Sequence, residues 1–143
     1  MPPLLGVVNM DALHTYIQSV KDKPFEWGSF DCYCFASKAI EIQTGRGLPL
    51  TYGYKTAKGA LRQLKAFHRE AHLTSTEAYL DWAYMRLPKG VLPHSGGLVS
   101  RVYDDPYFKS ILGIYVDGKV VFPGANGLEF TDIDFDKDTF WVI

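Results

Sequence analysis

A cysteine at the expected start of a helix is the residue of this chain best suited to covalent chemistry. Cys32 follows Asp31 in the segment "PFEWGSFDCYCFASKAIEIQTG", which runs from Pro24 to Gly45. The free N–H groups and the positive dipole at the start of a helix stabilise a thiolate and can donate hydrogen bonds to an oxyanion. Cys32 is therefore a candidate nucleophile, and the alternative is that it is a small buried packing residue.

A cysteine nucleophile generally needs a base beside it, so the histidines are the next residues to place. His94, in the loop "VLPHSGG", could turn towards Cys32 or could face solvent. His68 and His72 are four residues apart and on a helix could hold zinc together with Cys32 or Cys34. The C-x-x-C spacing typical of zinc sites is absent, so we expect no metal and no cofactor, and we expect Cys34 to pack in the interior.

The elements that would position Cys32 can be predicted from hydrophobic periodicity. Apolar residues recur at helical spacing in four segments. The expected helices run from an N-cap at Asn9 through Val20 to a stop at Pro24, from Asp31 to Thr44 with Gly45 as the C-terminal stop, over "AKGALRQLKAF", and from a Thr74–Glu77 capping box to a stop at Pro88.

From Gly96 onwards the pattern changes to short runs rich in valine, isoleucine and aromatic residues. The predicted strands are "GLVSRVY", "SILGIYV", "KVVFPG", "GLEF" and "TFWVI". Asp117-Gly118 between the second and third runs predicts a type I′ hairpin, and an antiparallel meander is expected. Helices followed by strands indicate an α+β fold, in which N-terminal helices pack on a small C-terminal antiparallel sheet within a single domain of residues 1–143.

Charge and composition narrow the classes of partner. The chain has 143 residues, with 15 lysines and arginines against 16 acidic residues and a net charge of -1. No cluster of basic residues along the sequence resembles a phosphate-binding stripe, so we do not expect a nucleic-acid partner. No segment has the length and apolarity of a membrane span or a signal peptide, so we expect a protein made in the cytoplasm. The acidic run "TDIDFDKD" lacks the glycine and glutamate of a calcium loop, and we expect a solvated strand edge there with Ile133 and Phe135 facing inward.

The segments taken together resemble the papain-like, NlpC-type cell-wall cysteine peptidases, and in particular a small phage-encoded offshoot of that group. The matching segments are "PFEWGSFDCYCFA", "YKTAKGALRQL", "GGLV", "LGIYVDG", "FPGANGLEF" and "FWVI". The resemblance implies a papain-like fold in which Cys32 stands at the nucleophile position. It also implies that a histidine should open the first strand of the hairpin that follows.

The catalytic set implied by this resemblance is incomplete. Ile111 occupies the position of the histidine in "SILGIYVDG", Gly97 replaces an acidic residue often found before the first strand, and "KVVFPG" offers no polar residue to orient a base. The resemblance therefore implies a pseudoenzyme, a structural protein of a phage tail tip or baseplate located in the virion. The alternative is an active cysteine amidase or endopeptidase acting on peptidoglycan through Cys32.

The expected partners are other tail-tip or baseplate proteins, with peptidoglycan as a further possible partner. Two long loops, "LTYGYKTAKG" and "RVYDDPYFKS", combine aromatic residues with charged ones. This mixture is typical of protein–protein interfaces, in which a buried aromatic side chain is surrounded by a polar rim. We expect contact through the helical face and through these loops, including Tyr107 and Phe108, and not through the groove beside Cys32. The alternative is that these aromatic side chains cover the protein's own core.

Overall fold

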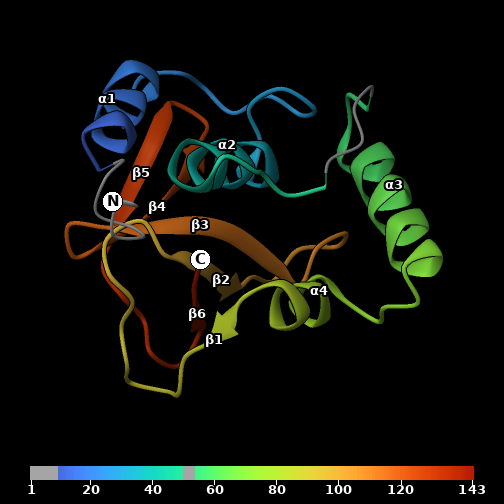
Figure 1. Cartoon of the computed structure of the whole chain (residues 1–143). Helices are drawn as coiled ribbons and strands as arrows, with labels where there is room; N and C mark the ends of the chain where they lie inside the picture. The colour runs from blue at the N-terminus through green and yellow to red at the C-terminus, as the bar shows by residue number, and fades with distance from the viewer. Residues whose placement is uncertain (1–9, 50–53) are drawn as a thin grey trace.

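The four helices that the structure describes all precede the strands of the sheet in chain order, as the sequence predicts. The computed structural model describes residues 10–49 and 54–143, and within them it shows an α+β fold of four helices and a six-stranded antiparallel sheet (Figure 1). The helices are α1 (Met10–Val20), α2 (Cys32–Thr44), α3 (Ala57–Glu70) and α4 (Thr76–Ala83). The strands are β1 (Met85–Arg86), β2 (Leu98–Val102), β3 (Ser110–Val116), β4 (Lys119–Gly124), β5 (Gly127–Thr131) and β6 (Asp138–Val142).

Helix α2 has the predicted ends because both of its caps are local in sequence. Asp31 is the N-cap, and its carboxylate accepts a hydrogen bond from the backbone N–H of Cys34 at 2.8 Å. Gly45 adopts φ 84°, a left-handed conformation that favours glycine, and its N–H donates to the carbonyl of Glu41 at 2.8 Å. The prediction of a helix from Asp31 to Thr44 is confirmed, with Asp31 as its cap. The N-cap predicted at Asn9 lies outside the described residues.

The fourth helix differs from the prediction at both ends. Its N-cap is Ser75 and not Thr74, because the Ser75 hydroxyl accepts the N–H of Ala78 at 3.1 Å. The carboxylate of Glu77 is not available for a capping box, since it accepts hydrogen bonds from two serine hydroxyls of the sheet. The helix ends at Ala83, well before Pro88, because the chain next forms β1, a two-residue edge strand paired with β6.

The sheet has the strand order β1-β6-β2-β3-β4-β5, so β2 to β5 form the predicted meander and β6 returns between β1 and β2. Asp117 and Gly118 have φ of 51° and 81°, which confirms the type I′ turn between β3 and β4. The inward orientation predicted for Phe135 is wrong, because this side chain is 43% exposed. Ile133, in contrast, packs against the smaller apolar cluster on the second face of the sheet.

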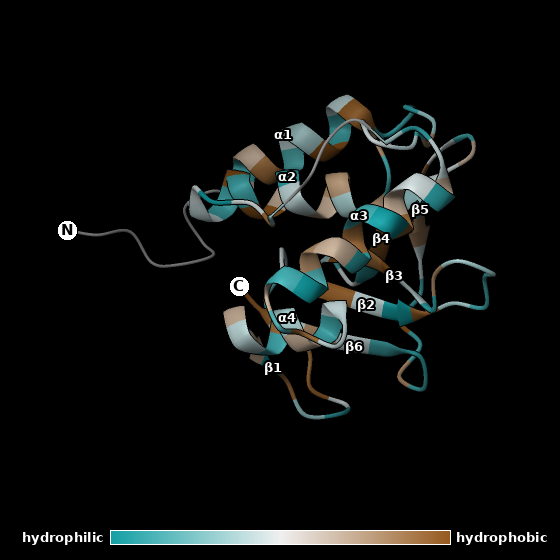
Figure 2. Cartoon of the chain, turned by 90° about the vertical axis from the view of Figure 1, so that its right-hand side faces the viewer, coloured by the Kyte–Doolittle hydropathy of each residue, from teal (hydrophilic) through white to brown (hydrophobic). Residues whose placement is uncertain are grey.

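The main core lies between the helices and one face of the sheet. The buried side chains of this core come from α1, α2 and α4 and from alternating strand positions, among them Leu13, Phe35, Ile40, Leu80, Leu98, Ile114, Val121 and Trp141. In the view of Figure 2, α1 and α2 lie above β2 and β3, with hydrophobic and hydrophilic residues interspersed along the helices. Helix α3 stands at the right-hand edge of the molecule in Figure 1, on the other side of α2 from α1.

Within residues 10–49 and 54–143, no helix combines the length and the apolar composition that crossing a membrane would need.

Candidate functional site

Asp31 fixes the start of the helix that carries Cys32. Its carboxylate accepts three hydrogen bonds: from the N–H of Cys34 at 2.8 Å, from the N–H of Gly28 at 3.0 Å and from the hydroxyl of Tyr54 at 2.6 Å. Gly28 has φ 83°, and a Cβ there would lie 2.1 Å from the carbonyl oxygen of Tyr54, so only glycine fits. Asp31 therefore holds the turn, the helix and the segment before α3 together, and its oxygens are occupied.

Tyr54 is a residue of this site that the sequence patterns did not identify. Burial, and then its hydrogen bond to Asp31, raise the pKa of the Tyr54 hydroxyl far above its ordinary value. The hydroxyl thus remains a donor to the carboxylate and cannot serve as a base near neutral pH. A tyrosine 23 residues from its partner carries no local signal in the sequence.

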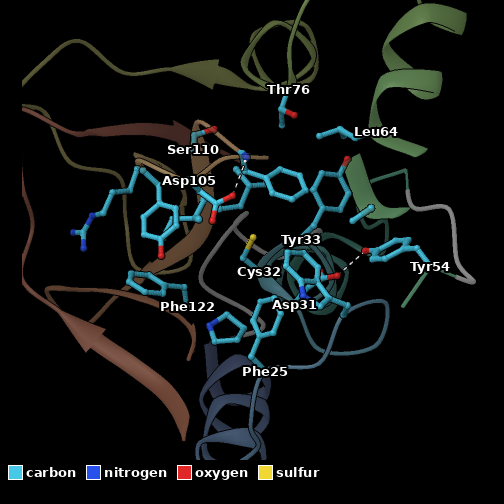
Figure 3. Close-up of a pocket in the computed structure, with 18 of the residues that line it drawn as sticks. Phe25, Asp31, Cys32, Tyr33, Tyr54, Leu64, Thr76, Asp105, Ser110 and Phe122 are labelled. Atoms are coloured by element: carbon cyan, nitrogen blue, oxygen red, sulfur yellow. Dashed lines mark hydrogen bonds between the residues drawn. The ribbon is translucent and has the colours of Figure 1, made fainter. Parts of the chain in front are cut away.

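The thiol of Cys32 lies in a large pocket whose lining is rich in aromatic side chains. Figure 3 shows the sulfur pointing into this pocket, which has a volume of about 790 Å³ and lies between the start of α2, the inner side of α3 and the edge of the sheet. Its aromatic lining consists of Phe25, Trp27, Tyr33, Tyr54, Phe67, Tyr103, Phe108 and Phe122. A pocket of this size could hold a small molecule or several side chains of another protein.

The strand that follows the motif reaches Cys32 as the sequence predicts. Leu112 and Ile111 of β3 line the pocket, and a backbone group of Leu112 forms a hydrogen bond with the thiol. The prediction that the Cys32 end of α2 abuts the strand starting near Ile111 is confirmed. The side chain at position 111 is aliphatic, so it can neither accept the thiol proton nor orient a base.

Burial raises the pKa of the Cys32 thiol from 9.0 to about 12. The residue is partly exposed, but the thiol itself is desolvated, and this disfavours the charged form more than any other effect. Backbone hydrogen bonds with Leu112 and Tyr33 lower the pKa, whereas the negative charge of Asp31 raises it. The thiolate stabilisation expected from the helix N-terminus is therefore outweighed, and Cys32 is a neutral thiol near pH 7.

No histidine among the described residues lines this pocket. His14 on α1 lies 3.1 Å from the carboxylate of Asp117. The side chain of His68 is 3.4 Å from the hydroxyl of Thr76, and burial lowers its pKa. All four histidines of the chain are at described positions, and the pocket lining contains none of them: His14, His68, His72 and His94. His94 is exposed. Of the two alternatives given for it, turning towards Cys32 or facing solvent, the structure shows the second.

The zinc pair considered from the sequence does not have the geometry of two ligands on one helix face. Helix α3 ends at Glu70, and His72 adopts φ 57° beyond it. The i, i+4 relation on one side of a helix therefore does not apply to His68 and His72. The described part of the chain contains no group of three or more histidine, cysteine or acidic residues that could hold a metal ion.

The cationic residue at the pocket is neutralised within the protein. The guanidinium of Arg101 on β2 forms an ion pair with the buried Asp138, with Nε 2.7 Å from Oδ1 and Nη2 2.9 Å from Oδ2. Arg101 also donates to the hydroxyl of Thr131 and to the carbonyl of Asp132. The expectation of a solvated acidic edge is thus wrong for Asp138. Most of the N–H donors of Arg101 already form hydrogen bonds within the protein, so few remain for a ligand in the pocket.

Cys34 lies on a different side of α2 from Cys32. Its sulfur is 3.8 Å from the hydroxyl of Tyr54, and burial, followed by the charge of Asp31, raises its pKa to about 11. It borders a second, smaller hollow of about 400 Å³ beside Tyr16. Cys34 is therefore a partly buried packing residue separated from the main pocket, as the sequence predicted.

The two residues singled out in the loop "RVYDDPYFKS" have different environments. Phe108 stacks on Trp27, with ring centroids 5.7 Å apart, and forms part of the pocket wall. Tyr107 is 44% exposed. Asp105 holds the turn by accepting the N–H groups of both residues. Phe108 thus serves the protein's own interior, while Tyr107 is accessible to a partner. Part of the other aromatic loop, residues 50–53, lies outside the described residues.

Comparison with known proteins gives one match. The model of a family described as a domain of unknown function, DUF6950, matches residues 9–142, which is nearly the whole chain. No curated protein and no solved structure matches the chain.

Proposed function

The chain belongs to the DUF6950 family, and from the resemblance of its sequence to NlpC-type peptidases, together with the state of the site, we propose that it is a structural protein of a phage tail tip or baseplate whose NlpC-like domain has lost its catalytic chemistry. In this proposal the protein is made in the host cytoplasm and built into the virion. There it binds other tail-tip or baseplate proteins.

The observation that carries the proposal is the state of Cys32. The residue has the placement of a nucleophile, at the first turn of α2, beside a strand and inside a pocket. Its thiol is desolvated, with a pKa of about 12, and the described residues place no histidine in the pocket. A neutral thiol without a base is a poor nucleophile, so Cys32 keeps the position of a catalytic cysteine but lacks the activation that catalysis needs.

The arrangement of the elements supports the same proposal. A helix with cysteine on its first turn packs against an antiparallel sheet, in the chain order that the resemblance to NlpC-type peptidases implies. Ile111 stands at the start of β3, where that resemblance places the histidine. An exposed Tyr107 on a long loop offers a contact for another protein.

The alternative remains an active cysteine amidase or endopeptidase acting on peptidoglycan. It would need a base from outside the pocket, or one supplied by a neighbouring protein, as well as a lower pKa for Cys32. Pocket size alone does not favour it, because an aromatic pocket of this kind suits apolar side chains as well as a substrate.

The proposal is tested by separating assembly from hydrolysis with the Cys32→Ala variant. We expect phage that carry this variant to assemble and infect almost normally, with a loss of protein stability of about 1 kcal/mol from the missing sulfur. Purified wild-type protein should release no muropeptides from peptidoglycan. Cys34→Ala is the matched control, since it removes a thiol on the other side of the same helix. Muropeptide release that disappears in Cys32→Ala but persists in Cys34→Ala would establish the active enzyme instead.

A further inference from the structure

Helix α3 has two faces of opposite character. On its inner side Ala60, Leu64 and Phe67 line the pocket. On its outer side the cationic residues follow one another at intervals of four, three and four positions: Lys58, Arg62, Lys65 and Arg69. At 3.6 residues per turn, these four side chains leave the helix within about 60° of each other. They define a basic stripe, and it lies on the side of α3 opposite the pocket.

The basic stripe carries charge that the rest of the described chain does not neutralise. All four side chains are exposed, and no ion pair among the described residues includes any of them. Five lysines and arginines outside α3 do form ion pairs, among them Arg86 with Asp81 and Lys119 with Asp132. Because the whole chain has a net charge of only -1, the remainder of the molecule is acidic overall. The four cations of the stripe therefore make the outer side of α3 a positively charged surface.

This geometry points to a binding surface, and we propose that the basic stripe of α3 binds an acidic segment of a partner protein. The stripe is about 17 Å long, at 1.5 Å of rise per residue. Its charges follow the i, i+3 and i, i+4 spacing at which helical side chains are neighbours. A partner helix with acidic residues at the same spacing could meet the four cations one after another. Such complementarity contributes mainly to the rate and specificity of association.

A membrane and a nucleic acid fit the stripe less well. A helix that binds a bilayer buries its apolar face in the lipid, but the apolar face of α3 lines the pocket, away from the cations. Nucleic-acid binding through a basic stripe is typical of domains that are strongly basic as a whole. Here the net charge is -1, so the chain as a whole is weakly acidic. A protein segment of matching length needs no further positive surface.

This inference goes beyond the proposed function, because the stripe would bind an acidic segment whether or not the protein belongs to a phage particle. It also revises the expectation that no cluster of lysines and arginines resembles a binding stripe for phosphate. The four cations are separated in sequence by two or three other residues, and only the helix brings them onto one line.

The test uses the full-length purified protein and a fluorescently labelled oligoglutamate peptide, with binding followed by anisotropy and located by NMR amide shifts. We expect the shifts to concentrate on α3 and the affinity to fall as salt is added. The double variant Arg62→Glu, Lys65→Glu should weaken binding by about tenfold or more, since two attractions become repulsions. The control Lys109→Glu, Lys137→Glu makes the same change in net charge at exposed sites outside α3 and should weaken binding by about twofold at most.

Three outcomes would overturn the proposal. The first is equal weakening by the two double variants, which would show a general charge effect. The second is tighter binding of short double-stranded DNA, or of mixed phosphatidylcholine and phosphatidylglycerol vesicles, than of the peptide at equal salt. The third is no binding at millimolar peptide. If the first variant fails to fold, Lys58→Gln with Arg69→Gln removes two charges at the ends of the stripe and should weaken binding in the same direction.

Discussion

The reactivity of Cys32 can be measured directly, and the structure predicts that it is low at neutral pH. The thiol has a pKa of about 12 instead of the ordinary 9.0, because it is desolvated. Below pH 9 each pKa unit reduces the thiolate fraction tenfold, so we expect about a thousandfold less thiolate than in an ordinary cysteine. Since the thiolate is the reactive form, alkylation by iodoacetamide should be slower by a comparable factor.

The assay must distinguish two neighbouring thiols. Cys32 and Cys34 lie within one segment between lysines, so the alkylation of each is followed by mass spectrometry in a protein that keeps only that cysteine, Cys34→Ser or Cys32→Ser. The rate at Cys32 should rise with pH through at least pH 10 without reaching a plateau. A plateau below about pH 8, or alkylation of folded protein at the rate of free cysteine, would refute the argument that desolvation dominates.

A second variant examines the missing base in the same assay. Ile111 and Cys32 line the same pocket, so Ile111→His should introduce an imidazole near the thiol and speed alkylation at neutral pH by about tenfold or more. Ile111→Val is the control, since it changes the size of the side chain without adding a base. Equal rates in these two variants would mean that position 111 does not face the sulfur.

Three further predictions concern the buried ion pair, alkaline stability and the aromatic loop. Arg101→Ala should lower the free energy of unfolding in urea by about 3 kcal/mol, because it leaves the buried Asp138 without its cation, whereas the more exposed Arg86→Ala should cost much less. The raised pKa of Cys32 contributes stability that is present below pH 9 and lost between pH 9 and 12, so the Tm of Cys32→Ala should fall less steeply over that range than the wild type. Tyr107→Ser should leave the Tm nearly unchanged and reduce incorporation into particles, and a large loss of Tm would instead assign this side chain to the core.

Features that depend on neighbouring residues could be predicted from the sequence. The helix of Cys32 follows from an aspartate cap and a closing glycine, and the β3–β4 hairpin follows from Asp117-Gly118. Strand β1 could not be predicted, because two residues carry no period and its pairing depends on β6, more than 50 positions later. The capping box failed for a related reason: Glu77 bonds to serines of distant strands and not to its own helix.

The candidate site likewise has features that could be predicted from the sequence and features that could not. The placement of Cys32 and the absence of a base at Ile111 were predictable from motif order. The thiol's pKa was not, since it depends on how completely the protein excludes water from the sulfur. The hydrogen bond between Tyr54 and Asp31 and the ion pair between Arg101 and Asp138 join residues far apart in the chain, so no local sequence pattern predicts them.

The position of β6 affects how this domain can fold during its synthesis. β6 is the last of the described strands in the chain, yet it lies between β1 and β2 and supplies the fully buried Trp141. A ribosome makes residues 138–142 after the other elements that the structure describes, so until they emerge β2 has an unpaired edge and the core lacks Trp141. A nascent chain at that stage would offer this edge to strands of other chains. The emergence of β6, and not the formation of the early helices, therefore commits the domain to its native sheet.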